Sequence, residues 1–273
     1  MRRILLIAMV FPLLCYSCKE KIPPAKEHFL KANDFLFKDD LVNAKKEYEQ
    51  ALDIDSNNWQ AAYELAGVYD LEGDFKKSYY YYSKTIQANP KFALAYFNRA
   101  NLEEIVGDEK GSMNDLGKTV ELKKDFYSAY LSLGQKEYAA GNFKKAISDF
   151  DEAIKLRNDF YMEYSMRGSC KFKIGDLDGA ISDFSMEIQL YPKHIMGYVN
   201  RGIVYGERKD YRSAIKDMDT AMQIDPLFSK GYLYEGLYYY KLNSKDTACG
   251  NFRIAYKLKN PEADAYMKQY CGK

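Results

Sequence analysis

The chain of 273 residues carries 40 basic and 39 acidic side chains, which leave a formal net charge of +1. This even balance argues against a nucleic-acid-binding protein, in which a basic patch or stripe is the usual electrostatic footprint. Beyond the N-terminus, no window contains the roughly 20 apolar residues that a membrane-spanning helix requires. We therefore expect neither nucleic acid as a partner nor a membrane-spanning helix in the folded part.

The first 17 residues have the layout of a secretory signal peptide. Arg2 and Arg3 precede an apolar stretch at 4–14, and small or polar residues lead to Cys18. A charged start, a short apolar core and a cleavage region are typical of such a signal, and this core is too short to span a bilayer. We predict that 1–17 are a signal peptide and that the protein is exported.

The same segment resembles a bacterial lipoprotein signal, whose peptidase needs a small residue before the cysteine that becomes acylated. Ser17 meets this requirement for Cys18, whereas Cys15 follows a bulky leucine. The resemblance implies that Cys18 is lipidated and that 18–24 form its tether. Because Lys19 rather than aspartate follows the cysteine, it also implies an outer-membrane lipoprotein, facing the periplasm or the cell surface. Other positions match the signal imperfectly, so ordinary secretion and an uncleaved anchor remain alternatives.

From residue 25 onward, the sequence repeats with a strict period of 34 residues. Each period contains one residue whose side chain favours a helix start by accepting a bond from a free backbone N–H. These residues are Asp40, Asp74, Asp108, Asn142, Asp176, Asp210 and Ser244. Four of them follow a glycine (Gly73, Gly107, Gly141 and Gly175), which readily takes the left-handed conformation that ends a helix. The period predicts tandem helix pairs.

Within each period, the residue sizes also repeat. Positions 8 and 20 are always small, and position 24 is bulky, for example Phe150 and Phe184. Small residues at matched places let two helices approach closely, and spacings of four place positions 20, 24 and 28 on one buried face. Proline ends the second helix at position 32 in three repeats, as at Pro90.

This pattern resembles the tetratricopeptide repeat, which has an aromatic residue near position 4, small residues at 8 and 20, and proline at 32. The resemblance implies an all-α fold, an α-solenoid of seven tandem helix-turn-helix repeats followed by a capping helix at 263–273. The seven repeats are 25–58, 59–92, 93–126, 127–160, 161–194, 195–228 and 229–262. We expect them to form one continuous solenoid.

Repeat 93–126 departs most from the pattern. Glu103 replaces an aromatic residue, Lys124 replaces the proline, and the second helix carries Gly111 and Gly117. Each glycine costs about 1 kcal/mol relative to alanine inside a helix. The repeat is either a tolerated variation within a cooperative array or a soft point at which the array can flex.

The sequence carries no pattern that predicts catalysis. Its two histidines, His28 and His194, fall in different repeats, and His194 occupies a position that is phenylalanine in four others. The segment from Gly111 to Thr119 resembles a phosphate-binding loop, but five residues separate its glycines instead of four. No cysteine–histidine spacing fits a metal site. We expect no enzyme activity and no cofactor.

The family resemblance implies that positions 2, 5, 6, 9, 12 and 13 of each first helix line a concave groove. Apolar, aromatic and methionine side chains dominate positions 2 and 5, which suits an extended or helical peptide segment. The predicted groove residues are Tyr63, Phe97, Asn98, Leu131, Met162, Met196, Asn200 and Leu233. Alternatively, adjacent repeats or self-association hide part of this surface.

These observations favour a membrane-anchored scaffold that binds protein or peptide partners in a bacterial envelope. Its membrane contact would be the lipid anchor only. A lipoprotein that captures glycans or nutrients is the alternative, although the absence of insertions between repeats argues against it. An enzyme with an unrecognised site is a third possibility.

Cys249 lies in the last full repeat and Cys271 in the predicted cap. Disulfides persist in the oxidising compartments that exported proteins reach. A bridge between them would hold the cap against the last repeat, and two free thiols are the alternative. Cys170 stands alone in its repeat and is expected to be a small buried apolar residue.

Overall fold

The structure is a computed structural model that describes residues 22–272. The predicted signal peptide and Cys18 lie outside the described residues. Within 22–272 the chain forms fifteen α-helices and no strand, which confirms the all-α solenoid class. None of the helices in this part of the chain has the length and apolar character needed to cross a membrane. The chain divides into two compact units at the boundary between residues 90 and 91, and each unit is described separately.

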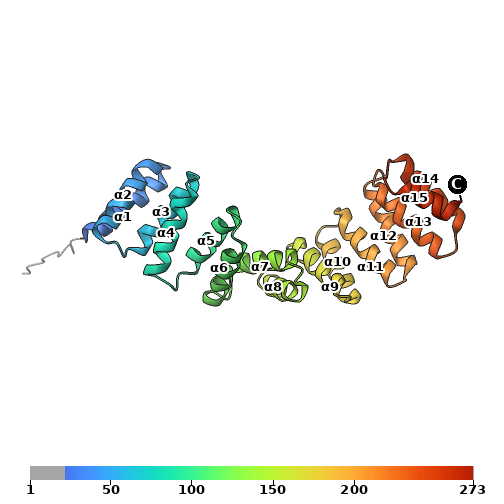
Figure 1. The fold of residues 1–273 in the computed structure, drawn as a ribbon, viewed down its shortest axis with the longest axis horizontal. Coiled ribbons are helices and arrows are strands. Elements are labelled where there is room, and N and C mark those ends of the chain that lie inside the picture. The colour runs from blue at the N-terminus through green and yellow to red at the C-terminus, as the bar shows by residue number, and fades with distance from the viewer. Residues whose placement is uncertain (1–21, 273) are drawn as a thin grey trace, which may run out of the picture. The chain divides into compact units, whose positions relative to one another are not determined.

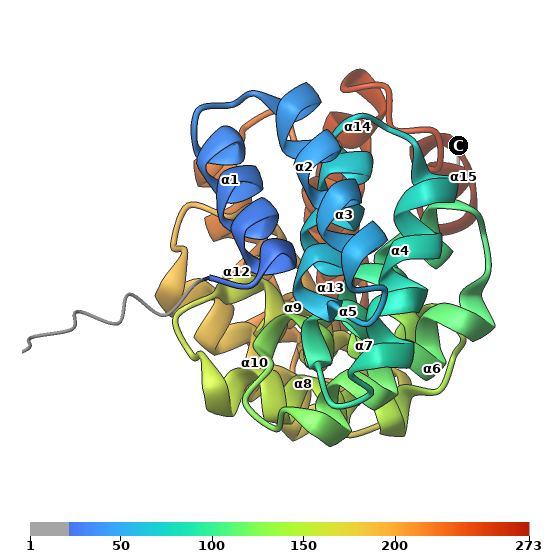
Figure 2. The ribbon, with the colours of Figure 1, turned by 90° about the vertical axis from the view of Figure 1, so that its left-hand side faces the viewer.

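Unit 1, the blue-to-teal part of Figure 1, contains the first two helix pairs. Its helices are α1 (Pro24–Phe37), α2 (Leu41–Ile54), α3 (Trp59–Leu71) and α4 (Phe75–Ala88). Figure 2 shows α1, α2 and α3 side by side. Ala32 and Ala44, at positions 8 and 20 of the first repeat, are fully buried against Tyr48. The predicted crossing point is therefore present in this pair.

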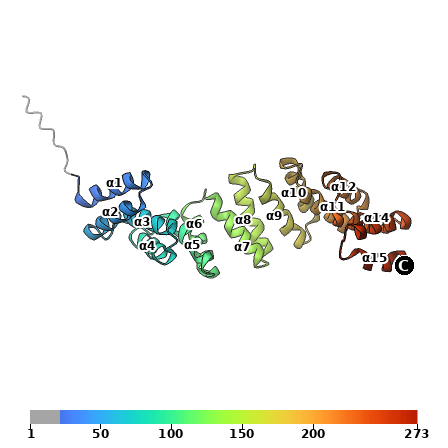
Figure 3. The same ribbon diagram turned by 90° about the horizontal axis from the view of Figure 1, so that it is seen from above.

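Unit 2 contains five helix pairs and a final single helix. The helices are α5 (Ala93–Ile105), α6 (Glu109–Leu122), α7 (Tyr127–Ala139), α8 (Phe143–Leu156), α9 (Tyr161–Lys173), α10 (Leu177–Leu190), α11 (Ile195–Glu207), α12 (Tyr211–Ile224), α13 (Ser229–Lys241), α14 (Lys245–Lys257) and α15 (Ala263–Cys271). In Figure 3, α7 to α10 lie next to one another in chain order. The pair boundaries agree with the 34-residue period read from the sequence.

Glycine at position 8 has a specific packing reason in unit 2. A Cβ atom on Gly134 would lie 2.7 Å from the ring of Phe150, and one on Gly236 would lie 2.6 Å from the ring of Phe252. In both repeats the position-24 ring occupies the space that a side chain at position 8 would need. The small residue thus makes room for the aromatic core residue as well as for the crossing helix.

A second helix starts directly after each of the seven predicted residues, and five of the seven side chains make the predicted cap bond. The side chains of Asp40, Asp74, Asp108, Asp176 and Asp210 each accept a bond from the backbone N–H three residues later. Asn142 does not cap its helix, because its amide instead donates to Glu137 Oε2 at 2.7 Å. Ser244 also makes no side-chain cap bond. Asparagine and serine at these two turns were therefore assigned a role that they do not have.

The turn before each second helix places one residue in the left-handed region. Gly73, Gly107, Gly141 and Gly175 have φ between 76° and 83°, as predicted. Asp39, Lys209 and Asn243 take the same conformation at the other three turns, with φ between 61° and 65°. This conformation disfavours residues that carry a Cβ.

In repeat 93–126, the two glycines do not interrupt the second helix. α6 is continuous, and Gly111 lies in its first turn, where its N–H donates to the Asp108 side chain. A Cβ on Gly111 would lie 2.6 Å from Asp108 Oδ2, so a glycine fits this cap closely. Gly111 therefore belongs to the start of the helix and not to its interior. Of the two glycines, only Gly117 has the helix-interior cost that the sequence predicted.

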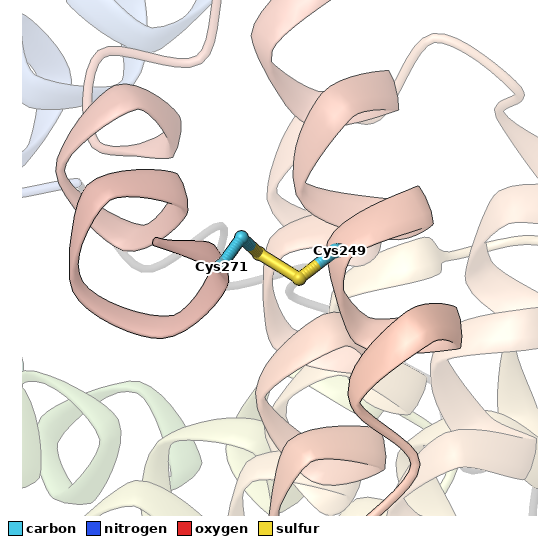
Figure 4. Close-up of a disulfide and its surroundings, with 2 residues drawn as sticks. All are labelled: Cys249 and Cys271. Atoms are coloured by element: carbon cyan, nitrogen blue, oxygen red, sulfur yellow. A yellow bond between two sulfur atoms is a disulfide. The ribbon is translucent and has the colours of Figure 1, made fainter. Parts of the chain in front are cut away.

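The C-terminal helix α15 packs on the last repeat. Tyr266 and Tyr270 place their rings 5.7 and 6.0 Å from that of Phe252. Figure 4 shows the disulfide between Cys249 and Cys271, whose Cα atoms are 5.9 Å apart. Cys170 is a buried free thiol whose pKa is raised to about 11 by burial.

Candidate peptide-binding surface

The surface of interest in unit 2 is formed by positions 2, 5, 6, 9, 12 and 13 of the first helices α5, α7, α9, α11 and α13. We call it the first-helix surface. Met162 and Met196, both at position 2, have exposed fractions of 46% and 40%. Leu131 and Asn200 are half-buried. These four predicted groove residues remain accessible within unit 2.

Other predicted groove residues are less accessible or lie elsewhere. Leu233 is only 2% exposed and packs with Phe252 in the core of the last repeat, so its side chain is absent from the surface. Phe97 is half-buried with its ring centroid 4.8 Å from that of Phe126. Asn98 is half-buried on the same helix. Tyr63 belongs to unit 1, where its ring lies 5.7 Å from that of Tyr82.

Two pockets open between consecutive repeats of unit 2, in nearly the same register. The first, which we call the α5–α7 pocket, has a volume of about 320 Å³. Its lining residues are Glu104, Glu109, Met113, Ser132, Gln135, Lys136, Ala139 and Ala140. Lys136 Nζ lies 3.0 Å from Glu104 Oε2, so the pocket's cation already has an anionic partner.

The second, which we call the α11–α13 pocket, has a volume of about 340 Å³. Its lining residues are Ile203, Gly206, Glu207, Lys209, Tyr211, Tyr234, Leu237, Tyr238 and Lys241. The Tyr238 ring stacks on Tyr211 at 6.2 Å between centroids and on Tyr234 at 6.5 Å. Burial raises the pKa of the Tyr238 hydroxyl, which stays a neutral group at physiological pH.

Gly206 gives this pocket its aromatic wall. A Cβ on Gly206 would lie 2.5 Å from a ring atom of Tyr238. A side chain at position 12 would therefore require the Tyr238 ring to move from its place beside α11. In the α5–α7 pocket, the residue at position 12 is Glu104, which supplies an ion-pair partner instead.

Lys209 and Lys241 lie at this aromatic pocket, and neither makes an ion pair or a hydrogen bond through its side chain to another described residue. Arg208, the neighbouring cation, is engaged by Asp178 at 2.7 Å and Asp210 at 3.6 Å. Glu207 is the only acidic residue that lines the pocket, so the described lining carries more positive than negative charge.

Sequence reasoning named positions 6, 9, 12 and 13 but selected residues mainly from positions 2 and 5, and so missed both pockets. Two signals in the sequence pointed to the α11–α13 pocket. Gly206 is a third glycine in a helix that already has Gly197 and Gly202, and Lys209 replaces the glycine that four other turns use.

The two histidines have structural partners. His194 Nδ1 lies 2.8 Å from Oε1 of the buried Glu187, and its ring stacks on Tyr191 with 5.6 Å between centroids. His28 Nδ1 lies 2.7 Å from Glu47 Oε2 in unit 1. Among residues 22–272, no three His, Cys, Asp or Glu side chains gather closely enough to hold a metal ion.

Comparisons with known proteins identify the same architecture. Residues 131–195 match the tetratricopeptide repeat family model. No curated protein sequence matches the chain. The structure resembles the crystal structure of MamA, with 23% identity, a TM-score of 0.59, and coverage of 63% of this chain and 94% of that one.

Two further solved structures are similar. One is YrrB, described as a tetratricopeptide repeat protein with an unusual peptide-binding site, with 18% identity, a TM-score of 0.62, and coverage of 69% of this chain and 97% of that one. The other is the C-terminal part of a repeat-containing protein from Cytophaga hutchinsonii, with 15% identity, a TM-score of 0.67, and coverage of 87% and 98%. At these identities the likeness concerns the fold. The chain therefore has the fold of tetratricopeptide repeat proteins, and its central residues match that family in sequence.

Proposed function

We propose that the protein is a scaffold that binds protein or peptide segments through the first-helix surface of unit 2. The observation that carries this proposal is the exposure of Met162 and Met196 on successive first helices, on the same surface as two inter-repeat pockets. Methionine side chains adapt to irregular apolar partners. A helical surface that exposes apolar side chains beside polar ones suits the binding of a peptide segment. The peptide-binding site named for YrrB supports the same reading.

We further propose that the scaffold works in a bacterial cell envelope, held at the outer membrane by a lipid on Cys18. The support comes from the sequence alone: a charged start, a short apolar core and Ser17 directly before the cysteine. Pro23, directly before α1, fixes the backbone at the end of the short tether that would follow. The folded part would then meet its partners beside the membrane.

Site-specific photo-crosslinking in the cells that make the protein tests the binding surface. A photoreactive phenylalanine analogue replaces Met162 or Met196 in the full chain, and adducts are identified by mass. We expect one or a few discrete protein adducts at these positions. The same analogue at Lys155, an exposed position on the second helix α8, is the control and should give none. Equal adducts at all three positions, or none at any, would contradict the proposal.

A further inference from the structure

The α11–α13 pocket differs from the α5–α7 pocket in two ways that bear on a ligand. Its walls are tyrosine rings and aliphatic side chains, and its lysines have no partner among the described residues. In the α5–α7 pocket, Lys136 and Glu104 neutralise each other. A similar position between repeats thus has an internally paired form and a form in which two unpaired lysines outnumber one acidic lining residue, Glu207.

We propose that the α11–α13 pocket binds an acidic peptide segment, which inserts one apolar or aromatic side chain among the tyrosines and places flanking side-chain carboxylates against Lys209 and Lys241. This inference rests on the proposed function and names the chemistry of the partner. A volume of about 340 Å³ is at the lower end of the range for ligand pockets, about 300 to 1,000 Å³, and suits one side chain of a larger partner.

The backbone at Lys209 supports a functional role for this residue. Lys209 has φ of 65°, a conformation that four equivalent turns give to glycine. A non-glycine residue in this region is uncommon, and strained residues of this kind concentrate at binding sites. Asp39, Asn243 and Lys259 also take this conformation, but among these residues Lys209 alone lines the α11–α13 pocket. Its ammonium group at the pocket is the feature that glycine could not supply.

The aromatic wall explains why the acidic segment must also carry an apolar side chain. Tyr238 is 8% exposed and its ring occupies the space that a Cβ on Gly206 would need, while Tyr234 and Leu237 are half-buried. Burying an apolar side chain against such a wall removes apolar area from water. The lysines then orient the segment, because charge complementarity contributes specificity more than affinity.

Isothermal titration calorimetry of the full chain in detergent, with a defined peptide panel, tests the proposal. The probes are eight-residue glycine–serine peptides, capped at both ends, with a central Asp-Leu-Asp or Asp-Tyr-Asp. The matched peptides carry Asn-Leu-Asn, Lys-Leu-Lys or Asp-Ser-Asp. Capping removes the terminal carboxylate, so any binding reports side-chain carboxylates. We expect the Asp-Leu-Asp and Asp-Tyr-Asp peptides to bind at least tenfold more tightly than each matched peptide. Their affinity should fall as the salt concentration is raised.

Two variants locate the binding, and two more serve as controls. The double variant Lys209→Gly with Lys241→Gln should lower the affinity for the acidic peptides roughly tenfold, because two partly exposed charge pairs between protein and peptide are lost. Gly206→Ala should also weaken them, since the added Cβ displaces the Tyr238 ring. Asn243→Gly, at the turn position of Lys209, and Lys173→Gln, at the helix position of Lys241, are the matched controls and should bind as the unchanged protein does. Unaltered helical content and a melting temperature no lower than that of the unchanged protein show that each variant is folded.

Each outcome decides the proposal. Binding that survives the double variant, or that is equal for the Lys-Leu-Lys peptide, overturns it. If no peptide of the panel binds while Met162 still gives discrete adducts, the scaffold function stands and the acidic-segment inference is wrong. If the panel binds as expected but Met162 and Met196 give no adduct, the pocket is supported and the wider first-helix surface is not.

Discussion

Arg201 and Asp217 form a bidentate ion pair between α11 and α12, with Nε 2.8 Å from Oδ2 and Nη2 2.7 Å from Oδ1. Arg167 and Asp183 form the same pair one repeat earlier, as do Arg99 and Asp115 in repeat 93–126. In each case the arginine is at position 7 and the aspartate at position 23. The aspartates are nearly buried, so the pairs connect the two helices of a repeat inside the array.

Removing only the arginine should be more costly than removing both partners. Arg201→Leu leaves Asp217, 4% exposed, without its countercharge, and we expect a loss of about 3 kcal/mol of unfolding free energy. Arg201→Leu with Asp217→Leu should cost clearly less, because no buried charge remains. Chemical unfolding combined with hydrogen exchange in α11 and α12 measures both variants. If Arg201→Leu is as stable as the double variant, the unpaired Asp217 carboxylate carries no energetic cost, and the prediction is wrong.

Some repeats of the chain lack this arginine, and carboxyl groups in two of them have raised pKa values. In repeat 127–160, position 7 is Leu133, and burial, with repulsion from Glu137, raises the pKa of Asp149 to about 6. In the last repeat, position 7 is Glu235. Burial and repulsion from Asp219 raise its pKa to about 7, partly offset by a hydrogen bond from Asn251.

The last repeat should therefore lose stability as pH rises. The pKa of Glu235 is higher in the folded protein than its ordinary 4.5, so its favourable contribution is full below about 4.5 and is lost as pH rises through about 7. Glu235→Gln should remove this dependence and gain about 2 kcal/mol at pH 8 relative to the unchanged protein. Melting curves at pH 5 and pH 8 measure the difference. Asp219→Asn, which removes the repulsion together with a carboxyl group whose own pKa is raised by burial, should have a smaller effect in the same direction. Identical pH dependence in all three proteins would contradict this assignment.

Lys209→Gly should stabilise the protein, because glycine relieves the left-handed backbone strain at φ of 65°. We expect about 1 kcal/mol from the lost Cβ penalty, reduced by the greater freedom of glycine in the unfolded chain. Asn243→Gly is the matched comparison, and its gain should be smaller since asparagine tolerates this conformation. Unfolding midpoints in urea rank the two variants. A destabilised Lys209→Gly protein would mean that the lysine side chain supports the fold.

The 34-residue period predicted the helices well, but it did not predict which of the named groove residues are exposed. Position within a period determines which residues meet across a helix pair, as Gly134 and Phe150 do, because that contact is local. Exposure at positions 2 and 5 depends on the next repeat: Met196 stays at the surface, whereas Leu233 is covered by the last repeat and its cap. The pockets depend on contacts between repeats, such as Tyr238 on Gly206, which no single period contains.

Cys18→Ala tests the proposed lipid anchor. If Cys18 is acylated, the variant should lose the mass of the lipid and leave the membrane fraction, because the lipid is the proposed membrane contact. Cys15→Ala is the matched control and should remain with the membrane. A Cys18→Ala protein that still fractionates with membranes, at a mass unchanged apart from the substitution, would contradict the anchor.

The disulfide between Cys249 and Cys271 should hold α15 on the last repeat. α15 has nine residues, too few for a stable isolated helix, and it depends on packing of Tyr266 and Tyr270 against Phe252. Closing a loop with a separation of 22 residues contributes about 3 kcal/mol in the chain-entropy model. Reductant should therefore lower the melting temperature and speed hydrogen exchange in α15.

A variant with alanine at both 249 and 271 is the control for this experiment, and reductant should leave its melting temperature unchanged. Because Cys170 is buried and unpaired, it should not respond in either protein. Peptide mapping under non-reducing conditions identifies the bond directly. Recovery of Cys249 and Cys271 as two alkylatable thiols in the exported protein would show that packing alone holds the cap, and the stability difference with reductant should then vanish.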